Sequence, residues 1–255
     1  SIRRAYGKAE GLLEEAAISE DDFQDTIPEA EIKADKRYVA LIREGISKIS
    51  TQESIESAHH AAVLEAIVFD QGGKGWLGKE TQMYRPAEYD DLRNGTDLLA
   101  KFQPGLATVS AENNKSYLGL GIDATFSNSL HTKFAKILEG LKSGTLTEVK
   151  YFKDEDTGSI GLKDLPKVVV GMNISTLARL SRLWLEGKEE QLFRDPAQVL
   201  ILKEIEVQLE ALRGYGEKNN MPHIQTAAHR PLARIKQLLR ERSSLIKGAE
   251  DIFTD

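Results

Sequence analysis

Two aspartates stand inside otherwise apolar runs: Asp97 in GTDLLAKF and Asp123 in LGLGIDATFS. Aspartate is depleted in β-strands, and a buried carboxylate without a partner is costly. If the two runs are neighbouring strands, the carboxylates repel each other unless a cation lies between them. Hard divalent cations such as Mg²⁺ or Mn²⁺ take oxygen ligands and can polarise a phosphate group. The pair therefore predicts a metal site with Asp97 and Asp123 as ligands.

A hairpin is expected to carry the first of these aspartates. Asn94-Gly95 lies between two strand-like runs, residues 89–93 and 96–102, which is typical of a type I′ turn. In this hairpin Asp90 would share a face with Asp97, displaced diagonally. Asp90 is then either an accessory acid or a solvated strand end, and the solvated end is favoured.

Three further strands and one helix complete the expected α/β core. Residues 117–126 predict a strand that is apolar on both faces and therefore central, and residues 131–141 predict a helix. Residues 146–152 and 167–172 predict two more strands. A strand–helix–strand unit over residues 117–152 would be a crossover with parallel strands. The pattern predicts an α/β fold in which a mixed β-sheet, an antiparallel hairpin plus a parallel crossover, is flanked by helices.

Helical periodicity dominates both ends of the chain. The pattern predicts a helical N-terminal extension over residues 1–52, an α/β core over residues 53–187 and a helical C-terminal extension over residues 188–255. The three parts are expected to pack as one domain. Either extension could also mediate homo-oligomer formation.

The order of elements resembles the PD-(D/E)XK metal-dependent nucleases, which have a restriction-endonuclease-like fold. The resemblance rests on an acid in a helix, Glu65 in AAVLEAIVF, followed by Asp97 and Asp123. It implies that both aspartates ligate Mg²⁺ and that Glu65 adds a ligand. The pattern expects a lysine at Thr125, so the resemblance implies that another lysine orients or activates the attacking water.

Two lysines could take the place of the missing one. Lys150, in LTEVKYF, is expected on the strand beside that of Asp123, and Lys133 in the first turns of the following helix. Lys150 is favoured, because a lysine in an apolar strand is harder to explain as solvent decoration.

The bulk composition narrows the class of protein. The 255 residues contain no cysteine, which excludes disulfides and thiolate metal sites and fits a cytoplasmic location. No window approaches a membrane span. The net charge of −6 argues against a protein that coats nucleic acid, but not against one that contacts it locally.

Positive charge is concentrated near the C-terminus. Residues 223–247 hold six Lys or Arg and one acid, and they include Arg230, Arg234, Lys236 and Arg240. These four are either a solvated helix face or contacts to a phosphate backbone.

Together these observations favour a metal-dependent phosphodiesterase that acts on DNA, with Asp97, Asp123, Glu65 and Lys150 or Lys133 in its active site. The alternative is a catalytically inactive, nuclease-like protein that binds a partner through its helical extensions.

Overall fold

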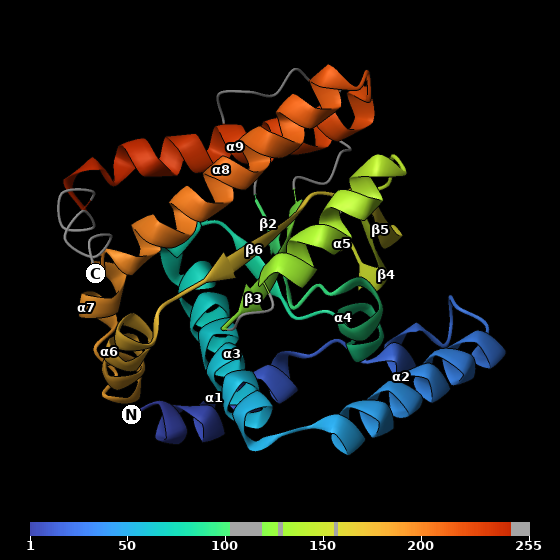
Figure 1. Ribbon diagram of the computed structural model, residues 1–255, viewed down its shortest axis with the longest axis horizontal. Coiled ribbons are helices and arrows are strands. Elements are labelled where there is room, and N and C mark those ends of the chain that lie inside the picture. Colours follow the sequence, from blue (N-terminus) through green and yellow to red (C-terminus); the bar gives the residue numbers. More distant parts are fainter. Residues whose placement is uncertain (103–118, 127–129, 156–157, 246–255) are drawn as a thin grey trace.

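The computed structural model describes residues 1–102, 119–126, 130–155 and 158–245, and Figure 1 shows their arrangement. The longer helices are α1 (Ile2–Ala16), α2 (Glu29–Ile49), α3 (Gln52–Gln71), α5 (Leu130–Lys142), α6 (Ile174–Leu185), α8 (Ala197–Lys218) and α9 (Pro222–Glu241). Shorter helices are η1 (Glu20–Phe23), η2 (Gly72–Trp76), α4 (Glu88–Asn94) and α7 (Glu189–Phe193). The strands are β1 (Gln82–Tyr84), β2 (Leu98–Lys101), β3 (Gly119–Thr125), β4 (Thr147–Lys153), β5 (Ile160–Leu165) and β6 (Lys167–Gly171).

A four-stranded mixed sheet lies at the centre of the molecule (Figure 1). Its order is β1-β2-β3-β6, with the first three strands antiparallel and β6 parallel to β3. The prediction of a mixed sheet flanked by helices is therefore confirmed. All residues of β3 are buried, as expected of a strand with a neighbour on each side.

The two faces of this sheet are covered differently. The face that carries Leu120 and Ile122 packs into one large apolar cluster together with Leu64 of α3. Leu99 points to the other face and packs against the two-stranded sheet of β4 and β5.

The large cluster draws on all parts of the chain. It contains Leu13 of α1, Leu64 of α3, Leu202 of α8 and Leu232 of α9. The two terminal helical segments thus share a core with the segment that holds the sheet. Among the described residues, no helix combines the length and the apolar character needed to span a bilayer.

The expected hairpin around Asn94-Gly95 is wrong. Residues 88–94 form helix α4, and Gly95 ends it in the left-handed conformation, with φ 61° and ψ 47°. Its amide donates to the carbonyl of Asp91 at 2.7 Å. Asn-Gly suits a helix C-terminus as well as a turn because both need positive φ. The place beside β2 that was expected for residues 89–93 is taken by the three-residue strand β1. This strand is too short for its alternating pattern to be detected in the sequence.

The expected crossover over residues 117–152 is also wrong. Strand β4 pairs with β5 in a separate antiparallel sheet, and the parallel partner of β3 is β6. The crossover therefore leaves β3 through α5, passes through the β4–β5 hairpin and returns in β6. Helix α9, which carries the basic residues near the C-terminus, begins at Pro222 and contains Pro231.

Candidate functional site

Asp97 directly precedes β2 and lies beside β3, the strand that carries Asp123. Leu98 of β2 pairs with Ile122 of β3, and the amide of Asp97 donates to the carbonyl of Ile122 at 3.1 Å. The Asp97 Oδ2 atom accepts the N–H of Ala124 at 2.7 Å. The Asp97 carboxylate thus reaches the backbone of the residue after Asp123, close enough for Asp123 to act on its pKa.

A third aspartate, Asp91 of α4, is hydrogen-bonded to the side chain of Asp97. Burial raises the pKa of Asp97 well above its usual value, and the carboxylates of Asp91, Asp123 and Glu65 raise it further. Burial also raises the pKa of Asp91, although the hydrogen bond from Asp97 opposes this shift. Two carboxyl groups in such contact share a proton, because both cannot ionise freely.

Glu65 reaches the same cluster from α3 and is only 8% exposed. Arg85 Nε donates to Glu65 Oε1 at 3.0 Å, while Arg85 Nη1 donates to the carbonyl of Leu13 at 3.0 Å. Burial raises the pKa of Glu65 to about 7 against the opposing effect of Arg85. The arginine therefore compensates only part of the cost of burying this acid.

Two lysines bring positive charge to the cluster. Lys133 of α5 forms an ion pair with Asp123, which is 4% exposed. Lys167, the first residue of β6, donates to the carbonyl of Asn94 at 2.6 Å. Burial lowers the pKa of Lys167, while Asp123 and Asp97 act in the opposite direction.

Two glycines leave room for the Lys167 side chain. Gly121 pairs with Lys167 in the β3–β6 register, and a Cβ there would lie 3.3 Å from Thr96 Cγ2 and 3.6 Å from Lys167 Cγ. A Cβ on Gly95 would lie 3.4 Å from Lys167 Nζ and 3.8 Å from Asp123 Oδ2. The ammonium of Lys167 and the carboxylate of Asp123 therefore flank the same bare stretch of backbone.

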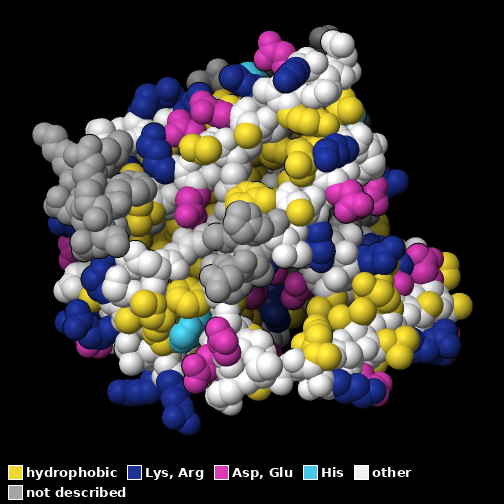
Figure 2. Space-filling view, viewed as in Figure 1, with side chains coloured by type: hydrophobic (Ala, Val, Ile, Leu, Met, Phe, Trp, Pro, Cys, Tyr) yellow, Lys and Arg dark blue, Asp and Glu magenta, His cyan; other side chains and the backbone are white. Residues whose placement is uncertain are grey.

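Figure 2 shows a hollow in the lower middle of this face, in which acidic and basic side chains gather. It lies between α3 and α4 as Figure 1 places them, the helices that carry Glu65 and Asp91. Asp91 and Asp97 keep partial exposure. The acid cluster (Glu65, Asp91, Asp97 and Asp123) is therefore open to solvent on one side.

The donor chemistry of the acid cluster suits a hard divalent cation, since it consists of carboxylate oxygens. Burial raises the pKa of Asp97, the neighbouring carboxylates add to this shift, and Lys133 opposes it only in part. Yet among the described residues no three or more His, Asp or Glu side chains are arranged so that they could hold a metal ion. Lys133 pairs with Asp123, and Arg85 pairs with Glu65. The donor type therefore suits a metal while the arrangement of three or more ligands is not present, and an ion at Asp123 would have to displace Lys133.

Lys150 and Asp90, two residues that the sequence analysis considered for the metal site, do not lie in the acid cluster. Lys150 is on β4, in the separate sheet, and pairs with Glu31 at 2.6 Å and with Asp35. Asp90 is fully buried and accepts the backbone N–H groups of Lys150 at 2.8 Å and Tyr151 at 2.9 Å. The expectation that Lys150 stands beside Asp123 is wrong, because β4 does not join the main sheet.

The four basic residues of α9 do not form one free stripe. Lys236 pairs with Glu210 of α8 at 2.5 Å, and Arg234 lies against Gly78. Arg230 and Arg240 are exposed. Helix α9 runs along the top of Figure 1, whereas α4 lies at the lower right of the sheet.

Sequence reasoning missed Asp91 and Lys167. Asp91 is adjacent to Asp90. In a strand over residues 89–93, Asp90 would share a face with Asp97, whereas in the helix α4 it is Asp91 that contacts Asp97. The register of a parallel pair is not visible in the sequence, so nothing linked Lys167 to Gly121. Comparison with protein-family models, with curated proteins and with solved structures gives no match for this chain.

Proposed function

We propose that the protein is a metal-dependent phosphodiesterase acting on DNA, with the acid cluster as its active site. The observation that carries the proposal is the close approach of Asp97 and Asp123, in which Asp97 Oδ2 accepts the N–H of Ala124 and the two carboxyl groups repel each other. Hydrolysis of a phosphodiester needs charge stabilisation at the scissile phosphate, which carboxylate-bound cations and lysines provide.

The order of elements supports the proposal. A helix with Glu65 is followed by the antiparallel strands β1, β2 and β3, then by α5 and the parallel strand β6. This is the layout on which the resemblance to the PD-(D/E)XK nucleases rests, with β1 and β2 in the role of the expected hairpin. The choice of DNA as substrate rests on that resemblance.

Each residue of the site has a distinct role in the proposal. Asp97 and Asp123 would hold Mg²⁺ or Mn²⁺, with Asp91 and Glu65 as auxiliary acids. The bound ion would supply positive charge at the scissile phosphate. Lys167 would orient the attacking water or a phosphate oxygen through its N–H groups, the role left vacant at Thr125.

Lys133 has a second role in the proposal. Its ammonium pairs with Asp123. It would neutralise that carboxylate until the divalent ion arrives, and then turn toward the substrate phosphate.

Cleavage of supercoiled plasmid and of short DNA duplexes in Mg²⁺ or Mn²⁺ tests this function. Asp97→Asn and Lys167→Met should each reduce the rate by about 100-fold or more, as the loss of a charge-stabilising group does. Lys150→Met is the matched control, since this lysine also pairs with carboxylates but lies in the other sheet. Absence of wild-type cleavage with either ion, or full activity of Asp97→Asn, would refute the proposal.

A non-catalytic partner-binding protein is the second candidate, favoured by the Lys133–Asp123 ion pair and by Thr125. In that case Lys133 is the permanent counter-charge of the acid cluster. Thermal unfolding with Mn²⁺ separates the two, because a ligand that binds the folded state raises the melting temperature. An unchanged melting temperature would favour this second candidate.

A further inference from the structure

A cavity of about 450 Å³ between α6, α7 and the start of α8 is lined by several arginines. None of its lining residues belongs to the acid cluster. They are Arg179, Arg182, Leu183, Glu190, Gln191, Arg194, Asp195 and Pro196.

The innermost arginine is only partly satisfied. Arg179 Nη1 forms an ion pair with the buried Asp195, whose Oδ1 accepts the N–H of Ala197 at 2.9 Å at the start of α8. Arg179 Nη2 is buried and, within the described part of the chain, has no hydrogen-bond partner. Since this nitrogen is buried, a ligand in the cavity would meet the positive charge of Arg179 and not its Nη2 donor.

Arg182 adds a charge that no described residue balances by an ion pair or hydrogen bond. It lies one helical turn from Arg179 and is exposed on the same cavity. Arg194, at the rim, pairs with Glu190 at 2.9 Å, but both side chains are more than 70% exposed and the pair is therefore weak.

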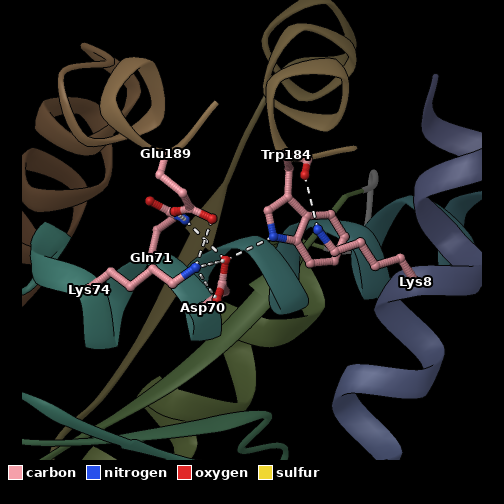
Figure 3. A network of polar contacts seen from close by, with 6 residues as sticks. All are labelled: Lys8, Asp70, Gln71, Lys74, Trp184 and Glu189. Atoms are coloured by element: carbon pink, nitrogen blue, oxygen red, sulfur yellow. Dashed lines mark hydrogen bonds and ion pairs between the residues drawn. The ribbon is translucent and has the colours of Figure 1, made fainter. Parts of the chain in front are cut away.

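The nearest other acids are already engaged, as Figure 3 shows. Lys74 contacts Asp70 at 3.0 Å and Glu189 at 2.8 Å. Trp184 Nε1 donates to Asp70 at 2.8 Å, and Lys8 donates to the carbonyl of Trp184 at 2.9 Å. This network ties α6 and α7 to α3 and α1, and it engages the carboxylates of Asp70 and Glu189 with partners outside the cavity.

Positive charge continues along the neighbouring helix. Ser1 Oγ donates to the carbonyl of Ala178 at 3.2 Å, so the start of α1 lies beside α6. Arg3 and Arg4 are exposed there, and Figure 2 shows basic side chains at the lower left, near the N-terminus. The cavity thus belongs to a basic surface in a protein whose net charge is −6.

We propose that this cavity is a binding site for a phosphate group, contacted by Arg182 and Arg194 and backed by Arg179. Guanidinium groups offer paired donors that match the oxygens of a phosphate. The phosphate would supply the counter-charge that Arg182 lacks and would be attracted by the charge of Arg179 behind it. The site is separate from the acid cluster, so it does not depend on the proposed nuclease function.

Thermal unfolding and calorimetric titration with inorganic phosphate test the site, with sodium chloride of equal ionic strength as reference. The wild-type melting temperature should rise in phosphate, and Arg182→Gln should weaken phosphate binding about tenfold, the loss expected of one charged hydrogen bond. Arg37→Gln on α2 is the matched control, because Arg37 is an exposed helical arginine bonded only within its own helix. An identical melting temperature in phosphate and chloride, or unchanged binding by Arg182→Gln, would overturn the proposal.

A second arm identifies the source of the phosphate group. Fluorescent oligo(dT) is titrated into the same two variants, with inorganic phosphate as competitor. Weaker binding to Arg182→Gln, with displacement by phosphate, assigns the site to a nucleic-acid backbone. Phosphate binding that depends on Arg182, without oligonucleotide binding, assigns it to a small phosphorylated ligand. Neither ligand depending on Arg182 would refute the site.

Discussion

Asp90 and Asp35 are buried much as Asp123 is, but they lie in a region where every buried carboxylate has matching donors. Asp90 accepts two backbone N–H groups of β4 and the side-chain amide of Asn94, and Asp35 accepts the hydroxyl of Tyr151 and the ammonium of Lys150. Burial raises the pKa of both Asp90 and Asp97, but the hydrogen bonds to Asp90 oppose the shift, whereas the neighbouring carboxylates of the acid cluster raise the pKa of Asp97 further. The first arrangement fastens β4 to α2 and α4, whereas the second leaves negative charge available to an added cation.

The largest expected effect on stability tests whether Asp90 anchors β4. Asp90→Ala leaves two buried N–H groups of β4 without an acceptor, and we expect a loss of about 3 kcal/mol in the free energy of unfolding. Urea denaturation followed by circular dichroism measures it. A loss below about 1 kcal/mol would mean that solvent replaces the carboxylate and that the region is not a structural anchor.

The acid cluster should respond with the opposite sign. Asp97→Asn removes a charge that Asp91, Asp123 and Glu65 oppose, and the amide oxygen can still accept the N–H of Ala124. We expect metal-free protein at pH 8 to gain on the order of 1 kcal/mol, the scale of a typical point mutation, because the amide need not be neutralised on folding. Asp90→Asn is the control and should lose stability. If both variants lose stability, the two regions do not differ in the way described.

The sequence predicted the parts of the fold that local patterns govern. The strand around Asp123 and the helix after it follow from short-range signals. Which strands pair does not. Asn94-Gly95 is compatible with a helix C-terminus and with a hairpin turn. The two are distinguished only by the pairing of β2 with β1, which leaves no place for residues 89–93 as a strand beside β2.

The site was predictable to the same extent. An aspartate in an apolar strand has few explanations, so Asp97 and Asp123 stood out from the sequence, and the structure brings them together. A lysine in a strand has several explanations. The apolar neighbours of Lys150 favour it as a site residue, but they pack between β4, β5 and Leu99, away from the acid cluster. Lys167 reaches the cluster only because β6 pairs with β3, which its own sequence does not reveal.

Glu65 makes the comparison testable through pH. Because burial raises its pKa from 4.5 to about 7, the unfolded state loses this proton first, and folding stability falls as pH rises between these values. Glu65→Gln should reduce that fall by about 1–2 kcal/mol between pH 5 and pH 8. Urea midpoints at the two pH values measure the effect.

Two other glutamates calibrate this measurement. Burial raises the pKa of Glu204 of α8 to about 7 as well, so Glu65→Gln should leave part of the slope. Lys236 lowers the pKa of the exposed Glu210, which is ionised in both states above pH 5, so Glu210→Gln should leave the slope unchanged. A wild-type slope in Glu65→Gln would show that Glu65 is not held in its neutral form.

The smallest expected effect concerns the backbone beside Lys167. Gly95 (φ 61°) and Gly144 (φ 75°) both follow helices in the left-handed conformation, so alanine at either position should cost about 1 kcal/mol. A methyl group at Gly144 meets nothing within 4 Å, whereas one at Gly95 contacts Lys167 Nζ and Asp123 Oδ2 at ordinary van der Waals distance. Gly95→Ala should therefore cost a few tenths of a kcal/mol more than Gly144→Ala, since its methyl group excludes water from two charged groups. In a Lys167→Met background this excess should disappear, because a double-mutant cycle isolates the interaction between the two positions. An excess that survives in that background would trace the cost to the backbone alone and separate Gly95 from the charge balance of the acid cluster.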